Sequence, residues 1–424
     1  DVWVAPTVVG LDWTSDAWVK SLPVYTVEAA PQRDILISTT ELPESQVVGG
    51  LEAEGLAPTV SPEASMKAQT VSAVGSPLKV TGKFVTPLSD DTYAGADTAL
   101  TGIVWGWVDI YRCSDDSYLG GGFTKAGKSA GKFSITIPNP VSEGFYVYIT
   151  PCSGAGCIEA PGGDWQSYGT FAGCFYSSSG ATSYSIGTWS IYDGSGYVYR
   201  LAWMIYESVV NDKRKWGAWN LFRNKLSPSW DMGYVVVRFP YETWAHYHPG
   251  GEIHLPTAND ARSPDVIQHE YGHFAMYTTY GTSFTTNCPS PHYINLWSHV
   301  NCAWSEGWAS YVSYVTHNDK TYTYANNFEV NEETPTWGTS GWDYGDGVEG
   351  RVTAALIDLD DGQNECGGTP RTCDRVGGLR NKLWNTFQGW GLTTTFYDFI
   401  HHYSLWYGYP STVDATLYHN TIDY

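Results

Sequence analysis

The chain has 424 residues, of which 42% are hydrophobic and 15% aromatic, so it is long enough for two or three domains and too rich in packing residues to be disordered. Only 16% of the residues are charged, yet the formal net charge is −21 because 44 Asp and Glu outnumber 23 Lys and Arg. This balance argues against binding to DNA, RNA or an anionic membrane surface, each of which requires a basic footprint on the protein.

Residues 1–77 remain unassigned, either as a pro-segment or as part of the folded protein. Within them, residues 51–77 have the Ala, Ser, Pro and Val content of a linker. Strand-like runs separated by Gly, Ser, Asp and Asn turns follow, at the spacing of a small β-sandwich. The stretch 153–185, dense in Gly, Ser, Tyr and Cys, is typical of an ordered loop region. We therefore predict a β-sandwich-like accessory domain over residues 78–185.

The remaining residues, 186–424, show apolar residues at helical spacing and a few strand-like runs. The run MGYVVVRFP predicts a buried strand, and GEIHLP predicts a short alternating strand. One helix has clear boundaries, because Ser263 can cap it, Pro264 suits its first position and Gly281 can end it. We expect helices over 197–210, 263–280, 301–316, 348–359 and 379–403.

Eight cysteines indicate an oxidising compartment, since an even number with short loops favours disulfides over a zinc site in a chain without Cys-x-x-Cys. Pairing by proximity joins Cys113 with Cys152, Cys157 with Cys174, Cys288 with Cys302 and Cys366 with Cys373. No apolar run approaches about 18 residues, so no membrane span is expected. The first ten residues lack the features of a signal peptide, and we therefore expect a secreted protein in a processed form.

The segment His269-Glu270-Tyr271-Gly272-His273 can hold a metal ion on the predicted helix over 263–280. Residues four apart share one helical face, so His269 and His273 can direct both imidazoles at one ion. Glu270 is placed to meet a metal-bound water rather than to chelate, and Gly272 leaves room for another segment to approach closely. Two structural histidines are the alternative, which the flanking glutamate and the helix context disfavour.

A catalytic zinc needs a third protein ligand and an open position for water. Glu306 is our candidate, because it lies in the predicted helix over 301–316 within the sequence WSEGWASY. A carboxylate among Trp304, Trp308 and Tyr311 is costly to bury unless it is paired or metal-bound, so a structural ion pair is the alternative. Other carboxylates lack this aromatic helix context, among them Glu332, Glu333 and Glu349.

HEYGH followed by SEGWAS resembles the gluzincin branch of the zincin metallopeptidases, the thermolysin-like group, over roughly residues 186–424. The resemblance implies a zincin-like catalytic domain in an α+β protein, with Zn²⁺ bound by His269, His273 and Glu306. GEIHLP resembles the edge strand that aligns the substrate, and GVEGRVTAALIDLDDG the helix that packs behind the site. Thermolysin-like enzymes commonly carry an Asp four residues after the ligand Glu, where this chain has Ser310.

The resemblance also implies a mechanism in which zinc lowers the pKa of its water and Glu270 transfers a proton from that water to the leaving amine. A second donor to the oxyanion is expected. The candidates, among which spacing does not choose, are Tyr344, His401, His402 and Tyr403.

Two further clusters could hold a metal. The first comprises His246, His248 and His254, and the second comprises Asp358, Asp360, Asp361 and Glu365. Histidines in such a run more often line a cleft or the surface than bind a second ion. Carboxylates at the end of a helix oppose its dipole, and bound Ca²⁺ would explain them, although their spacing is not that of an EF-hand.

Taken together, the sequence predicts a secreted, monomeric, zinc-dependent endopeptidase that acts on protein or peptide substrates. The alternatives are a non-catalytic secreted binding or surface protein on a zincin fold, and a zinc hydrolase of a non-peptide amide. The retained Glu270 disfavours the first alternative, because a binding protein has no need of a general base. The pattern does not set the substrate preference or the pH optimum.

Overall fold

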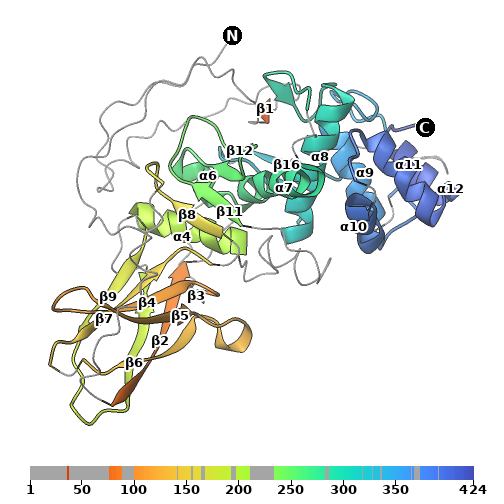
Figure 1. Cartoon of the computed structure of the whole chain (residues 1–424). Helices are drawn as coiled ribbons and strands as arrows, with labels where there is room; N and C mark the ends of the chain where they lie inside the picture. The colour runs from red at the N-terminus through yellow and green to blue at the C-terminus, as the bar shows by residue number, and fades with distance from the viewer. Residues whose placement is uncertain are drawn as a thin grey trace.

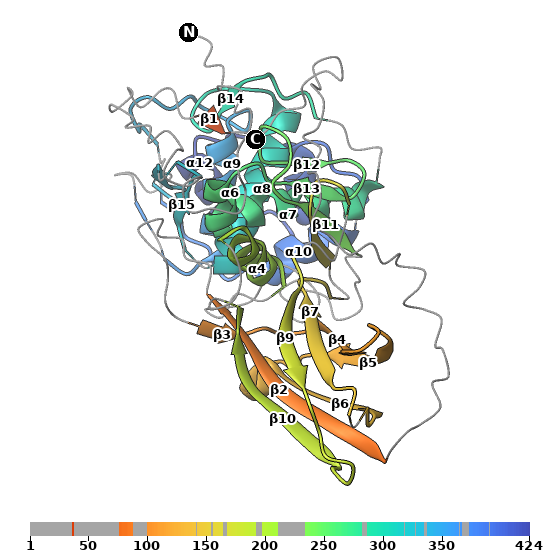
Figure 2. The same ribbon diagram turned by 90° about the vertical axis from the view of Figure 1, so that its left-hand side faces the viewer.

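The structure is a computed structural model that describes residues 36–37, 76–87, 100–140, 142–153, 156–163, 168–191, 197–210, 234–281, 286–317, 319–326, 328–334, 337–363, 365–366, 373–389 and 391–424. The expectations for residues 1–77 therefore lie almost wholly outside the described residues, apart from strand β1 (Leu36–Ile37), which pairs antiparallel with β14 (His292–Tyr293). In both views the strands of the first half gather at one end of the molecule and the helices of the second half at the other (Figures 1 and 2).

Two four-stranded sheets make up the first half. One contains β2 (Pro77–Pro87), β3 (Leu100–Gly102), β6 (Lys132–Pro138) and β10 (Ser183–Ser190), and the other contains β4 (Trp107–Arg112), β5 (Tyr118–Phe123), β7 (Phe145–Thr150) and β9 (Thr170–Phe175). Alternate side chains point inward, as along β6, where Phe133, Ile135 and Ile137 are buried. These side chains share one hydrophobic core with Val147 and Ile149 of β7.

The expectation of a loop region over 153–185 is wrong, because β8 (Gly156–Glu159) and β9 lie within it and β10 begins there. Backbone pairing with distant strands overrides the Gly- and Ser-rich composition of this stretch. β10 runs parallel to β2 across the predicted boundary at residue 185, while β8 pairs with β11 (Val235–Arg238) from the second half. The division of the chain into domains stays a prediction.

Two of the four disulfides predicted by proximity are wrong. The structure joins Cys113 with Cys174 and Cys152 with Cys157, with Cα–Cα distances of 6.2 and 4.1 Å. Cys113 follows β4 and Cys174 lies on β9, and both strands pair with β7 at Phe145 or its neighbour, so strand order rather than sequence distance brings them together. Cys152 and Cys157 face each other across an antiparallel bridge. The other two predictions agree with the structure, which joins Cys288 with Cys302 and Cys366 with Cys373.

The second half contains a sheet in the order β12-β13-β11-β8, with β12 at His246–His248 and β13 at Glu252–His254. β13 is flanked on both sides, antiparallel by β12 and parallel by β11. The expectation that GEIHLP forms the edge strand is therefore wrong: the run forms β13, and the edge belongs to β12, whose short polar sequence HYH gave no strand pattern.

Helices pack around this sheet and around one another. They are α4 (Tyr197–Val210), α6 (Ala258–Arg262), α7 (Pro264–Tyr280), α8 (Val300–His317), α9 (Glu349–Asp360), α10 (Arg380–Gly389), α11 (Phe396–Tyr407) and α12 (Ser411–His419). The helix expected over 379–403 is two helices, because Gly391 adopts a φ of 72° and Thr395 caps a new helix by accepting a hydrogen bond from Asp398 N at 3.0 Å. A small hairpin joins β15 (Thr321–Thr323) to β16 (Glu329–Asn331).

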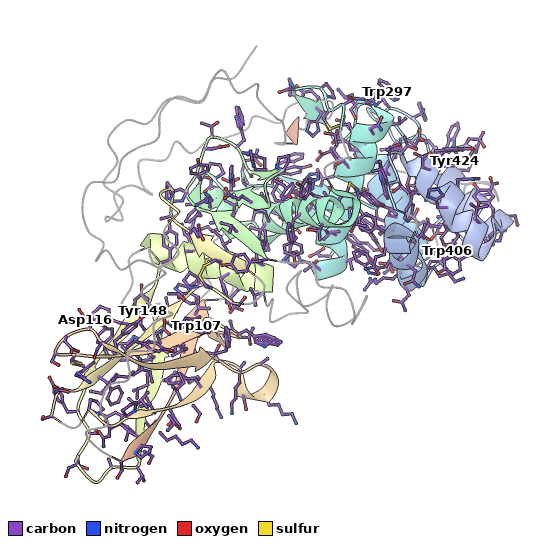
Figure 3. All side chains as sticks on the ribbon, in the orientation of Figure 1. Trp107, Asp116, Tyr148, Trp297, Trp406 and Tyr424 are labelled. Carbon is purple, nitrogen blue, oxygen red and sulfur yellow. A yellow bond between two sulfur atoms is a disulfide. The ribbon has the colours of Figure 1, made fainter. Side chains whose placement is uncertain are left out.

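The mixture of helices and strands agrees with the α+β prediction. Trp203, Trp304 and Trp308 are fully buried, whereas Trp297 and Trp406 stand out on the surface (Figure 3). Among the helices of the described residues, none combines the length and the apolar character needed to cross a membrane.

Candidate metal centre

Helix α7 starts and ends where the sequence predicts. Ser263 is its N-cap: the hydroxyl accepts a hydrogen bond from Val266 N at 3.2 Å and donates one to the carbonyl of Thr323 at 2.5 Å. Pro264 occupies the first turn, and Gly281 ends the helix with a φ of 70°. The cap therefore fixes the helix start against β15 as well as satisfying a backbone donor.

Helix α8 lies directly against α7 because a glycine removes the side chain between them. A Cβ added at Gly272 would lie 2.6 Å from Ala309 Cα, so only a hydrogen fits at this crossing. About two turns earlier on α7, Asp265 accepts hydrogen bonds from Ser313 Oγ at 2.6 Å and from His317 Nδ1 at 3.0 Å, both on α8. The close approach expected at Gly272 is thus made by the helix that carries Glu306.

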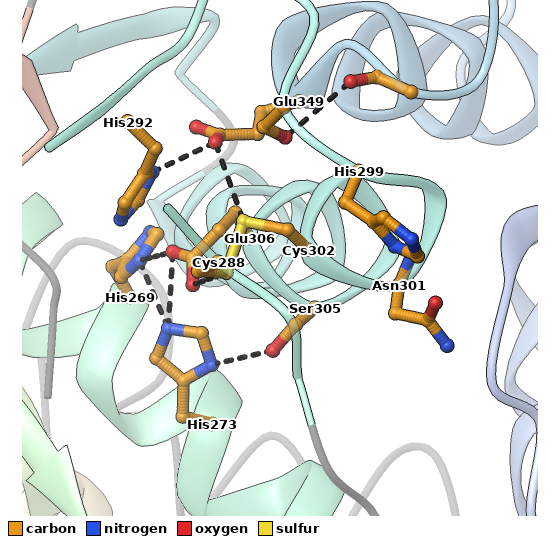
Figure 4. The surroundings of a disulfide bond; sticks show 12 residues. His269, His273, Cys288, His292, His299, Asn301, Cys302, Ser305, Glu306 and Glu349 are labelled. Atoms are coloured by element: carbon orange, nitrogen blue, oxygen red, sulfur yellow. Dashed lines mark hydrogen bonds and ion pairs between the residues drawn. A yellow bond between two sulfur atoms is a disulfide. The ribbon is translucent and has the colours of Figure 1, made fainter. Parts of the chain in front are cut away.

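The ligand atoms of His269, His273 and Glu306 converge on one point between the two helices (Figure 4). Nε2 of His269 lies 3.0 Å from Oε2 of Glu306 and 3.1 Å from Nε2 of His273, and the third side of this triangle measures 3.3 Å. Ligands bound tetrahedrally to zinc at about 2.05 Å are about 3.3 Å apart. The three side chains therefore fit the coordination triangle of a zinc ion.

Burial and charge keep His269 and Glu306 in the form that binds metal. Burial is the largest cause of the lowered pKa of His269, which favours its neutral imidazole. Burial alone would lower the pKa of His273 as well, but the charge of Glu306 and the hydrogen bond to it raise that pKa above its ordinary value. Burial alone would raise the pKa of Glu306, but the charge of His273 and hydrogen bonds from both histidines bring it well below its ordinary value. A neutral imidazole beside an ionised carboxylate is the donor set that zinc prefers.

Serine hydroxyls fix the orientation of both imidazoles. Nδ1 of His273 lies 3.2 Å from Ser305 Oγ, and Nδ1 of His269 lies 3.2 Å from Ser310 Oγ. The position where thermolysin-like enzymes place an Asp is therefore in contact with the first histidine here too. Ser310 in turn hydrogen-bonds the buried acid Glu332. Burial, together with the charge of Asp265, raises the pKa of Glu332 well above its ordinary value.

Glu270 is buried beside this triangle, with a side chain that solvent barely reaches. Burial is the main cause that raises its pKa to about 8, with Glu306 adding to the shift and His273 opposing it. The backbone of Tyr247, on the edge strand β12, hydrogen-bonds the Glu270 carboxylate, and Oε2 has no hydrogen-bond partner among the described residues. A buried carboxyl group with a raised pKa can hold and release a proton near neutral pH.

Two site residues escaped sequence reasoning. His292 and Glu349 are both buried, with 2.7 Å between Nδ1 and Oε1, and the charge of His292 acts on both His269 and Glu306. Glu349 lies at the start of α9, in the segment expected to pack behind the site. His292 follows a proline in a segment without periodicity, so no sequence pattern indicated it. The Cys288–Cys302 disulfide lies next to this pair and to Glu306 (Figure 4).

The candidates for the oxyanion donor have contacts elsewhere. Tyr344 packs against Trp337 with its ring tilted and lies near Arg351, and Tyr403 packs against Tyr407. His401 stacks on Tyr397, and its neighbour is His402. Their assignment to the oxyanion stays a prediction.

The acidic cluster at the end of α9 is arranged differently from the expectation. Nε of Arg380 lies 3.0 and 2.8 Å from the two carboxylate oxygens of Asp360. Asp361 lies 2.7 Å from Lys320 Nζ, so arginine and lysine balance the charge of both acids. The carboxylates that come within ligand distance of one another are Glu333, Asp358 and Glu365. A calcium ion at this end of α9 would therefore use Asp358 and Glu365 with Glu333, and it stays a prediction.

Comparison with known proteins gives one family match. Residues 235–395 match the mycolysin C-terminal domain. This range contains α7, α8 and α9 with the whole triangle, and the match supports a relationship to gluzincin-type, thermolysin-family proteases, which are zinc-dependent. The comparison with curated proteins finds no match. A crystal structure of a 9R-lipoxygenase from Cyanothece PCC8801 aligns at 12% identity over 51% of this chain and 25% of that chain, with a TM-score of 0.17, which carries no argument about the fold.

Proposed function

We propose that this chain is a secreted zinc metalloendopeptidase whose metal is bound by His269, His273 and Glu306. The observation that carries the proposal is the convergence of Nε2, Nε2 and Oε2 at 3.0 to 3.3 Å beside a buried Glu270. The match to the mycolysin C-terminal domain and the four disulfides support a protease that works outside the cell. In this proposal the second half, predicted over residues 186–424, forms a zincin-like catalytic domain, and the two sheets of the first half form an accessory β-sandwich.

A zinc ion in the triangle would lower the pKa of a water molecule and polarise the scissile carbonyl. Glu270 accepts the proton from the attacking water and delivers it to the leaving nitrogen, for which its raised pKa suits it. Ser305 and Ser310 hold the two imidazoles in the tautomer whose Nε2 points at the metal.

Strand β12 provides a place for an extended substrate. It ends the sheet β12-β13-β11-β8, so one side of its backbone has no strand partner among the described residues. Its Tyr247 contacts the carboxylate of Glu270, so a peptide added along this edge would run past the metal triangle. Edge pairing reads the peptide backbone rather than its side chains, which fits an endopeptidase of broad preference.

The Glu270→Gln variant tests the role of the general base. We expect it to bind zinc like the wild type but to cleave casein about 100- to 10,000-fold more slowly, because the amide cannot take up a proton. Glu329→Gln, which alters an exposed carboxylate outside the triangle, is the matched control and should keep its activity. Cleavage that survives both Glu270→Gln and a zinc chelator would contradict the mechanism. Zinc binding without cleavage of any protein would favour a binding protein or an amidase.

A further inference from the structure

A second group of metal-binding side chains lies at the outer end of the sheet that carries β12 and β13. Oε2 of Glu242 lies 3.2 Å from Nε2 of His246 and 3.3 Å from Nδ1 of His254. All three ligand atoms lie within 4.8 Å of one another. The side chain of His254 is 4% exposed, that of His246 18% and that of Glu242 37%, so the cluster is buried on one side and open to solvent at the carboxylate.

The other nitrogen of each imidazole is already engaged by an acceptor. Nδ1 of His246 lies 3.1 Å from the carbonyl oxygen of Trp244, which can only accept, so this nitrogen carries the hydrogen. Nε2 of His254 lies 3.2 Å from Oε2 of Glu252, and Arg238 holds that carboxylate in a two-point ion pair at 2.8 and 2.7 Å. Nε2 of His254 therefore also carries its hydrogen.

In the neutral imidazoles, these bonds leave the lone pairs of His246 Nε2 and His254 Nδ1 directed at the carboxylate of Glu242. Lone pairs facing a carboxylate repel it unless a proton or a metal cation lies between them. Nδ1 of His254 is buried and has no hydrogen-bond partner among the described residues, although Glu242 Oε2 is so close. Ligating histidines typically donate their second N–H to a carbonyl or a carboxylate, which is the arrangement of Trp244 and Glu252 here.

The backbone at the cluster also favours a metal site. Glu242 has a φ of 62°, in the left-handed region that a residue with a side chain seldom adopts. A glycine or asparagine would suit that conformation better, so the unusual backbone points to a role for the Glu242 carboxylate. His246 and His254 are direct cross-strand partners of β12 and β13, which fixes their mutual position.

We propose that Glu242, His246 and His254 form a second site for a divalent transition metal such as Zn²⁺, separate from the triangle on α7 and α8. Two imidazoles and one carboxylate suit zinc, and the exposed side of Glu242 leaves room for water at the remaining position. The ion would tie the edge strand β12 both to β13 and to the loop that contains Glu242. This strand also contacts Glu270 through Tyr247, so the second ion would hold the edge beside the first site.

The stoichiometry of bound zinc tests the proposal. The full chain is stripped of metal, dialysed against Zn²⁺ with excess Ca²⁺ to fill carboxylate-only sites, and analysed for zinc by elemental analysis. We expect two equivalents in the wild type and in His248→Ala, a matched control because His248 lies on the same strand outside the cluster. His246→Ala and Glu242→Gln should each bind one equivalent, as should His273→Ala.

The double variant His246→Ala/His273→Ala should bind none, which shows that the equivalent kept by His246→Ala sits in the triangle of a folded protein. Glu252→Ala should weaken the second equivalent about 10- to 100-fold, because it removes the acceptor of the His254 N–H. If the wild type binds one equivalent and His246→Ala still binds it, the second site is overturned and the first is left intact. If the wild type binds one equivalent that His246→Ala loses and His273→Ala keeps, the proposed catalytic centre is overturned instead.

Discussion

The buried acid Glu332 supports His269, the first of the proposed zinc ligands, through a hydroxyl group. Nδ1 of His269 lies 3.2 Å from Ser310 Oγ, and Ser310 hydrogen-bonds the buried Glu332. Because burial raises the pKa of Glu332 well above its ordinary value, this acid is held in its neutral form more readily than an exposed carboxyl group. Ser310 thus orients the imidazole, while Glu332 orients Ser310.

This arrangement predicts different effects of two substitutions. Ser310→Ala removes the acceptor of the His269 N–H and should weaken zinc binding at the triangle about 10- to 100-fold. Glu332→Gln should change that affinity by less than about threefold, because a neutral acid and an amide both offer a carbonyl oxygen to Ser310. Competition with a chromophoric chelator measures both affinities. Ser313→Ala is the control, because it loses a hydrogen bond to Asp265 instead. An unchanged zinc affinity in Ser310→Ala would refute the role of Ser310 in orienting His269.

At the level of single residues, spacing predicted which side chains converge better than it predicted the groups that hold them in place. The i, i+4 histidines and Glu306 follow from helix geometry and from the cost of a carboxylate among tryptophans, and the structure brings their ligand atoms together. The sequence did not indicate Glu332 or His292. Both lie in segments whose place is set by packing against α8 or α9 rather than by local periodicity.

The pair α7 and α8 forms the framework of the site, and its spacing depends on Gly272. Gly272→Ala should lower the free energy of unfolding by about 1–3 kcal/mol, because the added methyl group meets backbone at Ala309 and the helices must separate. It should also weaken zinc binding, since Glu306 moves with α8. Urea unfolding and the chelator assay measure the two effects. Gly362→Ala, with no atom within 4 Å of the added Cβ, is the control.

Helices with clear start and stop residues were predictable, and strands defined by pairing were not. α7 begins at Pro264 after the Ser263 cap and ends before Gly281, and α9 falls within one residue of the expected range 348–359. By contrast β8, β9 and β12 have little hydrophobic alternation and exist because of their partners. The same cause explains the incorrect disulfide pairs in the first half, since Cys113 and Cys174 meet through the strand between them.

Over the whole molecule, bound zinc should contribute to stability by mass action. At free zinc about 1,000 times its dissociation constant, one site stabilises the folded chain by about 4 kcal/mol, so a chelator should lower the melting temperature by several degrees. Differential scanning calorimetry with and without chelator measures this shift. In His273→Ala the shift should shrink to the part due to the second site, and a shift as large as that of the wild type would contradict zinc binding by the triangle.

The Cys288–Cys302 disulfide has a consequence for how the protein matures. Its sulfur atoms lie within 4.8 Å of Glu306, and Cys302 sits one helical turn before that ligand on α8. In a reduced chain, two thiolates and Glu306 would form a competing site that could bind zinc in place of the two histidines. Disulfide formation removes both thiolates, so zinc could no longer bind there. If zinc binds the triangle, we therefore expect the cysteines to be joined before the ion binds.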